Sequence, residues 1–213
     1  MIVDAGPPGG QPPAGVVARA ADVLRAGRVV ALPTDTVYGL AALPGVEGAT
    51  ARLFALKRRG ADAPIAVLCA SAGQALGLAD PTAVTGEVRR IAARLWPGPL
   101  TLVLPRRPGL GYALGEPAAT IGVRCPDHGL VRALAAEVGP LATTSANLHG
   151  GATPTTAAGV AALFGPRGLD LVLDGGSCAA APSAVVDATA GAWRLLRAGT
   201  ITLADIESAA HAP

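Results

Sequence analysis

Hydrophobic positions in this chain form two kinds of pattern. Short, continuous apolar runs are typical of buried strands, and they predict strands over residues 29–32, 64–69, 100–104, 120–128, 140–147, 169–174, 182–189 and 192–197. Apolar residues at helical spacing predict helices over residues 14–26, 46–57, 72–79, 82–95, 128–138, 157–164 and 202–210. Strands that alternate with helices indicate an α/β fold.

The strand over residues 29–32 leads into an unusually polar loop. Pro33 ends the strand, and Thr34, Asp35 and Thr36 follow before Tyr38 and Gly39. Sheets of α/β proteins bind ligands at the carboxyl ends of their strands. The loop is therefore a candidate binding element, although an ordinary turn remains an equal alternative.

Residues 140–147 repeat this plan, because an apolar strand again ends in hydroxyl side chains. Thr143, Thr144, Ser145 and Asn147 come in quick succession, and a helix follows from Thr155 or Thr156. Capping would explain one or two of these polar residues but not four. A polar loop before a helix N-terminus suits an anion.

Arg124 is a charged residue inside an otherwise apolar strand, on the same face as Thr120 and Gly122. A buried charge needs a partner. A protein carboxylate and an anionic ligand are both open, with the ligand slightly favoured. Asp127 is expected to cap the helix 128–138, with His128 in the turn before it.

The amino-acid composition indicates a single globular domain with an aliphatic core. Half of the 213 residues are hydrophobic (51%) but only 3% are aromatic, so small aliphatic side chains must form the core. We expect one domain over residues 14–210 after a flexible Pro/Gly-rich arm over residues 1–13. A net charge of +2 does not by itself indicate nucleic-acid binding.

The cysteine spacing and the lack of a membrane-spanning run or signal peptide indicate the cellular compartment. Cys69, Cys125 and Cys178 lie far apart, which argues against zinc and disulfides and favours buried thiols in a reducing compartment. No apolar run is long enough to span a membrane, and no signal peptide is recognisable. We therefore expect a cytoplasmic protein that does not associate with membranes.

Lys57 is the only lysine among 17 basic residues, and Asn147 is the only asparagine. In a chain so rich in arginine, a retained lysine suggests a need for a compact ammonium. Lys57, Arg58 and Arg59 end a helix, where a solvated cap is the alternative. Trp96 is expected to anchor the core rather than stack on a ligand.

Standard catalytic motifs are missing from the sequence. It contains no P-loop, no G-x-G-x-x-G after a strand and no G-x-S-x-G elbow. What remains is a set of hydroxyls with scattered cations at Lys57, Arg59, Arg124 and Arg197. Such groups suit a polyphosphate or a carboxylate, so the residues indicate a nucleotide or acidic-metabolite site.

Six motifs in order resemble the YrdC family of threonylcarbamoyl-AMP synthases. They are P-T-D-T-V-Y-G-L at 33–40, K-x-R at 57–59, W-P-G-P-L-T at 96–101, G-V-R-x-P-D-H at 122–128, T-S-A-N at 144–147 and S-x-V-V-D…L-L-R-x-G at 183–199. The resemblance implies a twisted, open mixed sheet flanked by helices, with a concave ligand-binding face. It also implies synthesis of L-threonylcarbamoyl-AMP and diphosphate from L-threonine, bicarbonate or CO2, and ATP with Mg²⁺.

The resemblance further assigns roles to residues of this chain. It implies ATP binding by Lys57, Arg59, Thr120, Ser145, Asn147, Thr153 and Arg197. It implies threonine binding by Thr34, Thr36, Arg124, Thr143 and Ser183. Neither a protein nucleophile nor a protein metal site is implied. The expected partners are tRNA or double-stranded RNA and the tRNA threonylcarbamoyl transferase complex.

Departures and alternatives remain. Leu68 stands where many members of the family have a histidine, and Leu148-His149-Gly150 replaces a frequent serine before glycine. The chain resembles the family's single-domain form. A double-stranded RNA or tRNA-binding module without adenylate-forming activity is the main alternative, and the related domain of hydrogenase-maturation proteins is another.

Overall fold

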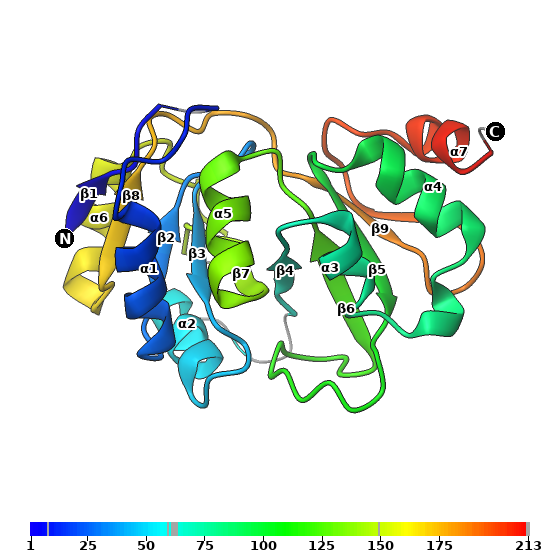
Figure 1. Ribbon diagram of the computed structural model, residues 1–213, viewed down its shortest axis with the longest axis horizontal. Helices are drawn as coiled ribbons and strands as arrows, with labels where there is room; N and C mark the ends of the chain where they lie inside the picture. Colours follow the sequence, from blue (N-terminus) through cyan, green and yellow to red (C-terminus); the bar gives the residue numbers. More distant parts are fainter. Residues whose placement is uncertain (8, 59, 61–63, 149, 212–213) are drawn as a thin grey trace.

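The computed structural model describes residues 1–7, 9–58, 60, 64–148 and 150–211. Within them, ten strands form one mixed sheet in the order β1-β8-β2-β3-β7-β4-β6-β5-β9-β10 (Figure 1). The strands are β1 (Ile2–Asp4), β2 (Val30–Leu32), β3 (Gly39–Ala42), β4 (Ala66–Leu68), β5 (Leu100–Pro105), β6 (Thr120–Arg124), β7 (Leu141–Ser145), β8 (Leu171–Asp174), β9 (Ala184–Asp187) and β10 (Arg194–Arg197). The expected open sheet of an α/β fold is confirmed.

Helices cover both faces of this sheet (Figure 1). They are α1 (Val16–Arg25), α2 (Ala49–Lys57), α3 (Ala72–Leu76), α4 (Gly86–Leu95), α5 (Gly129–Val138), α6 (Ala157–Phe164) and α7 (Leu203–His211). Alternate residues of β2 belong to different hydrophobic clusters: Leu32 packs with α1 and α5, and Ala31 with the cluster that includes α2 and α6. The sheet is therefore buried on both sides, as its continuous apolar strands require.

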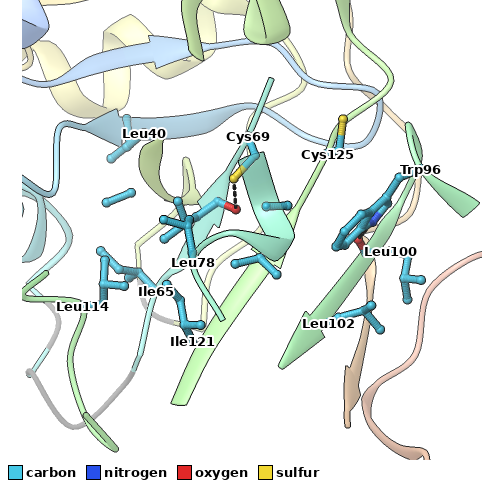
Figure 2. Packing of buried hydrophobic residues seen from close by; sticks show 14 of the residues in the cluster. Leu40, Ile65, Cys69, Leu78, Trp96, Leu100, Leu102, Leu114, Ile121 and Cys125 are labelled. Carbon is cyan, nitrogen blue, oxygen red and sulfur yellow. Dashed lines mark hydrogen bonds between the residues drawn. The ribbon is translucent and has the colours of Figure 1, made fainter. Parts of the chain in front are cut away.

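Trp96 anchors the core, as expected from the sequence (Figure 2). Its side chain is 6% exposed, and its Nε1 donates to the carbonyl oxygen of Leu100 over 2.7 Å. Cys69, Cys125 and Cys178 are free and buried, which confirms the expected buried thiols. Burial raises the pKa of the Cys69 thiol, so this group stays protonated.

Three expectations about local structure are wrong. Residues 1–13 are not wholly a flexible arm, because β1 pairs in parallel with β8. The polar loop was expected to extend through Gly39, but Gly39 already begins β3 (Gly39–Ala42), which pairs with β2 and β7. Asp127 does not cap α5, because His128 holds the N-cap position and Asp127 pairs instead with Arg132 at 2.9 Å.

The other element boundaries agree with the sequence within a few residues. Thr156 caps α6 by accepting a hydrogen bond from the Gly159 backbone nitrogen. The β9–β10 hairpin turns at Gly191, whose φ of 74° suits glycine. Among the described helices, none combines the length and apolar character needed to cross a membrane.

Candidate active site

A cavity of about 640 Å³ lies over strands from both halves of the sheet. Ten of the twelve residues proposed for binding line it: Thr34, Thr36, Thr120, Arg124, Thr143, Ser145, Asn147, Thr153, Ser183 and Arg197. Lys57 lies next to this lining, and Arg59 lies outside the described residues. The fold therefore brings together groups that are dispersed from one end of the sequence to the other.

Lys57 holds two of the residues that line this cavity, Ser145 and Asn147. Its side chain is buried (3% exposed), and its Nζ lies 2.5 Å from the carbonyl oxygen of Ser145 and 3.1 Å from Oδ1 of Asn147. Ser145 also donates its hydroxyl to Oδ1 of Asn147, and the Asn147 amide donates to the carbonyl oxygen of Gly151. The end of α2 is thus tied to the end of β7, with a positive charge at the junction.

Arg124 occupies another part of the cavity, held on three sides. Its Nη2 lies 2.6 Å from Oδ1 of Asp35, its Nη1 donates to the Thr36 hydroxyl, and its Nε donates to the carbonyl oxygen of Gly98. Burial lowers the pKa of Arg124, and the Asp35 charge opposes that shift. Of the two partners left open, the protein carboxylate is the one observed, yet Arg124 still lines the cavity.

Arg197 brings another guanidinium group into the same cavity. Its Nε and Nη2 donate to the carbonyl oxygen of Ser183, and Nη2 also donates to the Ser183 hydroxyl over 2.9 Å. The pKa of Arg197 is lowered by burial and further by the charge of Arg124. Two like charges that share a partly buried site create a strong local preference for an anion.

Hydroxyl groups complete the lining between these charges. Thr34 and Thr36 hydrogen bond to each other through their hydroxyls over 2.9 Å, and Ser183 does the same with Thr101 over 3.0 Å. Thr143 donates its hydroxyl to the carbonyl oxygen of Leu141. These bonds fix the rotamers of neutral donors and acceptors, so the cavity is preorganised for a polar ligand.

The shape of the cavity also depends on Gly39. A Cβ atom at this position would lie 2.9 Å from Cγ2 of Thr143, closer than side-chain contacts allow. Both residues line the cavity, and their strands, β3 and β7, are hydrogen-bonded neighbours. The glycine is therefore required by the close packing of β3 on Thr143.

Sequence reasoning missed part of this site. Asp35 was not identified as the partner of Arg124, and Arg106 was not placed in the cavity. Arg106 donates to the carbonyl oxygens of Tyr112 and Thr120, which fastens the Gly/Pro-rich loop after β5 to the cavity wall. The only indication in the sequence was that Arg106 is the first residue of a Gly/Pro-rich loop that follows a strand.

Family comparisons agree with the geometry. The Sua5/YciO/YrdC family profile, described as "Telomere recombination", matches residues 22–199. The chain belongs to this family. Its relatives include the threonylcarbamoyl-AMP synthase of Enterobacter sp. (strain 638), which is 35% identical over 84% of this chain and 94% of the relative. The threonylcarbamoyl-AMP synthase of Pyrococcus abyssi is 38% identical over 88% of this chain and 55% of its own length.

Solved structures show the same fold. Pyrococcus abyssi Sua5 in complex with L-threonine superposes with a TM-score of 0.86 at 35% identity, over 98% of this chain and 60% of that chain. Escherichia coli YciO superposes with a TM-score of 0.84 at 22% identity, over 97% of this chain and 98% of that chain. The present chain thus spans little more than half of the Pyrococcus protein and nearly all of YciO.

Proposed function

We propose that this chain synthesises L-threonylcarbamoyl-AMP and diphosphate from L-threonine, bicarbonate or CO2, and ATP. The observation that carries this proposal is the shared cavity of Arg124 and Arg197, with the Lys57 network at its edge. These cations offer places for a carboxylate and for a polyphosphate at one site. The relatives named for this reaction support the same conclusion.

We propose one subsite for the threonine carboxylate and another for the ATP phosphates, each beside its own cations. L-Threonine is placed against Arg124, with Thr34, Thr36, Thr143 and Ser183 around it. ATP is placed against Lys57, Ser145, Asn147 and Arg197, with Thr120, Thr153 and Arg59 as further contacts. Supporting this division, Arg124 is held rigidly by Asp35, Thr36 and Gly98, while Ser145 and Asn147 lie at a strand end beside a buried ammonium.

The proposed reaction depends on how the substrates are positioned and needs no acid or base from the protein. The threonine amine and bicarbonate give a carbamate and water. A carbamate oxygen then attacks the α-phosphorus of ATP, the bond to the bridging oxygen breaks, and diphosphate leaves with that electron pair. Fixed cations stabilise the charge that develops on the phosphate oxygens, and rigid subsites align the attacking oxygen with the leaving group.

Mg²⁺ is proposed to enter with the nucleotide. Among the described residues, no group of three or more His, Cys, Asp or Glu side chains could hold a metal. The nearby carboxylates Asp35 and Asp187 already pair with Arg124 and Arg194. We further propose that the product serves threonylcarbamoyladenosine synthesis in tRNA, delivered to a transferase complex in the cytoplasm.

Diphosphate release tests the proposal. ATP, L-threonine and bicarbonate are supplied together with Mg²⁺, and each substrate is withheld in turn. Release that requires all three, with threonylcarbamoyl-AMP detected by mass spectrometry, supports the proposed reaction. Release without threonine, or none in the complete mixture, contradicts it; salt-sensitive RNA binding by the inactive chain would then favour the binding-module alternative.

A further inference from the structure

One carboxylate belongs to the wall of the cavity. Among the described residues, Asp187 at the end of β9 is the only acidic residue that lines it, whereas four arginines do: Arg106, Arg124, Arg194 and Arg197. The proposed subsites give Asp187 no role. A carboxylate repels the phosphates of ATP, so it suits a part of the ligand that donates hydrogen bonds.

The sheet places Asp187 at one end of the cavity floor. A row of neighbouring residues crosses five strands, from Thr143 through Ala66, Gly122 and Val103 to Asp187. All five residues line the cavity. The three in the middle are apolar, and four strand spacings make the row roughly 19 Å long. Asp187 is therefore separated by an apolar floor from the polar loop that follows β7.

Asp187 also lies close to the arginine that is placed against ATP. Arg197 is the register partner of Val185, and Asp187 is two residues further along β9. The two positions are therefore about 7 Å apart along the strand direction, and all three residues line the cavity. In a nucleotide the ribose follows directly on the α-phosphate. A ribose can thus reach Asp187 from a phosphate that is held at Arg197.

The Asp187 carboxylate keeps a position for one more donor. Its Oδ1 accepts hydrogen bonds from the backbone nitrogen and the hydroxyl of Thr189, and its Oδ2 accepts one from Nη2 of Arg194 over 2.7 Å. Burial raises the pKa of Asp187, but these hydrogen bonds outweigh burial and lower the pKa below its usual value. An ionised carboxylate has about four acceptor positions, and three are used. One acceptor position therefore remains on a carboxylate that its own turn holds in place.

We infer that Asp187 is a nucleotide-binding residue that accepts a hydrogen bond from a ribose hydroxyl of ATP and thereby selects ribonucleotides over deoxyribonucleotides. The inference rests on the proposed function, because ATP is placed there against Arg197. Carboxylates accept ribose hydroxyls in the same way in dinucleotide-binding sites. A site built around such a hydrogen bond rejects analogues that lack the hydroxyl.

Diphosphate release with ATP, 2′-deoxy-ATP and 3′-deoxy-ATP tests the inference. In the wild-type chain we expect kcat/KM to be about tenfold lower for at least one deoxy analogue than for ATP. Asp187→Asn keeps one oxygen for the Thr189 turn and replaces the other with an amide nitrogen that cannot accept. This variant should reduce the preference for ATP to less than about threefold, because the value for ATP falls.

Asp80→Asn is the matched control. Asp80 accepts the same two hydrogen bonds, from the backbone nitrogen and the hydroxyl of Thr82, but it does not line the cavity. Its substitution should leave both the rate and the preference for ATP unchanged. Thermal unfolding of each variant identifies those that lose activity through folding alone.

Three results would overturn the inference. One is equal use of all three nucleotides by the wild-type chain. Another is an equal loss with all three in Asp187→Asn, which would show that Asp187 only supports the hairpin turn. The third is recovery of Asp187→Asn by excess Mg²⁺, which would assign the carboxylate to the metal that accompanies the nucleotide.

Calorimetry of nucleotide binding without threonine or bicarbonate tests the same contact without turnover. Tighter binding of ATP than of a deoxy analogue, with the difference lost in Asp187→Asn, supports the inference. Diphosphate release that does not need threonine overturns only the proposed function. Threonine-dependent release with no preference among the nucleotides overturns only the role of Asp187.

Discussion

The side-chain nitrogen of Lys57 lies 3.1 Å from Oδ1 of Asn147, 90 positions further along the chain. The only lysine of the sequence therefore contacts its only asparagine. Because the same nitrogen also donates to the carbonyl oxygen of Ser145, the ammonium group is held at the end of β7. A planar guanidinium, which is larger and has its donors in a fixed fork, does not fit this geometry.

Replacement of Lys57 should therefore reduce ATP use, and arginine should not restore it. We expect Lys57→Ala and Lys57→Arg to lower diphosphate release about 10²-fold, the scale found when one charge-stabilising donor is removed. Arg58→Asn is the control, since Arg58 is exposed and asparagine tolerates its left-handed φ of 50°. Wild-type rates of adenylate formation in Lys57→Ala would contradict the assignment.

Substitution of Arg124 should raise the KM for threonine more than the KM for ATP. Lysine cannot reproduce the three directed hydrogen bonds to Asp35, Thr36 and Gly98. We expect Arg124→Lys to raise the KM for threonine at least about tenfold, which corresponds to about 1.4 kcal/mol. Arg124→Ala, which leaves Asp35 uncompensated, should also cost about 3–5 kcal/mol of stability by urea unfolding.

Arg132→Gln is the control for Arg124, because it removes the ion pair with Asp127 and a hydrogen bond to the carbonyl oxygen of Pro126 but changes no residue that lines the cavity. Its threonine KM should remain within about twofold of wild type, since exposed ion pairs contribute at most about 1 kcal/mol. If Arg124→Lys raises the KM for ATP more than the KM for threonine, the proposed assignment of the threonine and ATP subsites is wrong.

The contact between Gly39 and Thr143 makes a prediction about shape. Gly39→Ala places a methyl group against Cγ2 of Thr143 and should weaken threonine binding, measured by calorimetry. Adding Thr143→Ser removes that Cγ2 and keeps the hydroxyl that donates to Leu141. The double variant should therefore bind threonine more tightly than Gly39→Ala alone. Equal weakening in both variants would show that the steric contact is not the cause.

Tyr38 makes a prediction about alkaline pH. Its hydroxyl donates to the carbonyl oxygen of Gly176 over 2.8 Å, and burial raises its pKa to about 12. Tyrosine in the unfolded chain ionises near pH 10. Between pH 10 and about 12 the unfolded state therefore loses this proton while the folded state keeps it, so stability falls as pH rises.

Tyr38→Phe isolates this contribution. At pH 8 the variant should be less stable than wild type by about 1 kcal/mol, because the hydrogen bond to Gly176 is lost. Between pH 10 and 11 the difference should narrow, because phenylalanine does not ionise. Urea unfolding of both proteins across this range measures the difference, and a gap that stays constant with pH would contradict the explanation.

The strands and helices with clear periodicity could be predicted from the sequence, whereas β1 and β3 could not. β3 reads Gly-Leu-Ala-Ala and is buried throughout, so it shows no alternation of polar and apolar residues. β1 has three residues and precedes a stretch rich in proline and glycine. Its strand character comes from pairing with β8, a partner that local sequence does not reveal.

In the candidate site, too, the sequence indicated individual polar residues but not the contacts between residues far apart in the chain. Polar loops after strands marked Thr36 and Ser145 because their residue types are unusual at such positions. The need of Arg124 for a partner was also evident, since a buried charge is costly. The identity of Asp35 as that partner depends on how the sheet brings residues 89 positions apart into contact, which spacing alone does not determine.

The order of strands in the sheet has a consequence for protein synthesis. β9, which directly follows Ser183, and β10, which ends at Arg197, are the last strands to emerge from the ribosome. A nascent chain that ends before them already contains Lys57 and Arg124 but lacks Arg197. Under the proposed function, which places threonine against Arg124 and ATP against Arg197, a ligand set that uses both residues stabilises only the completed chain.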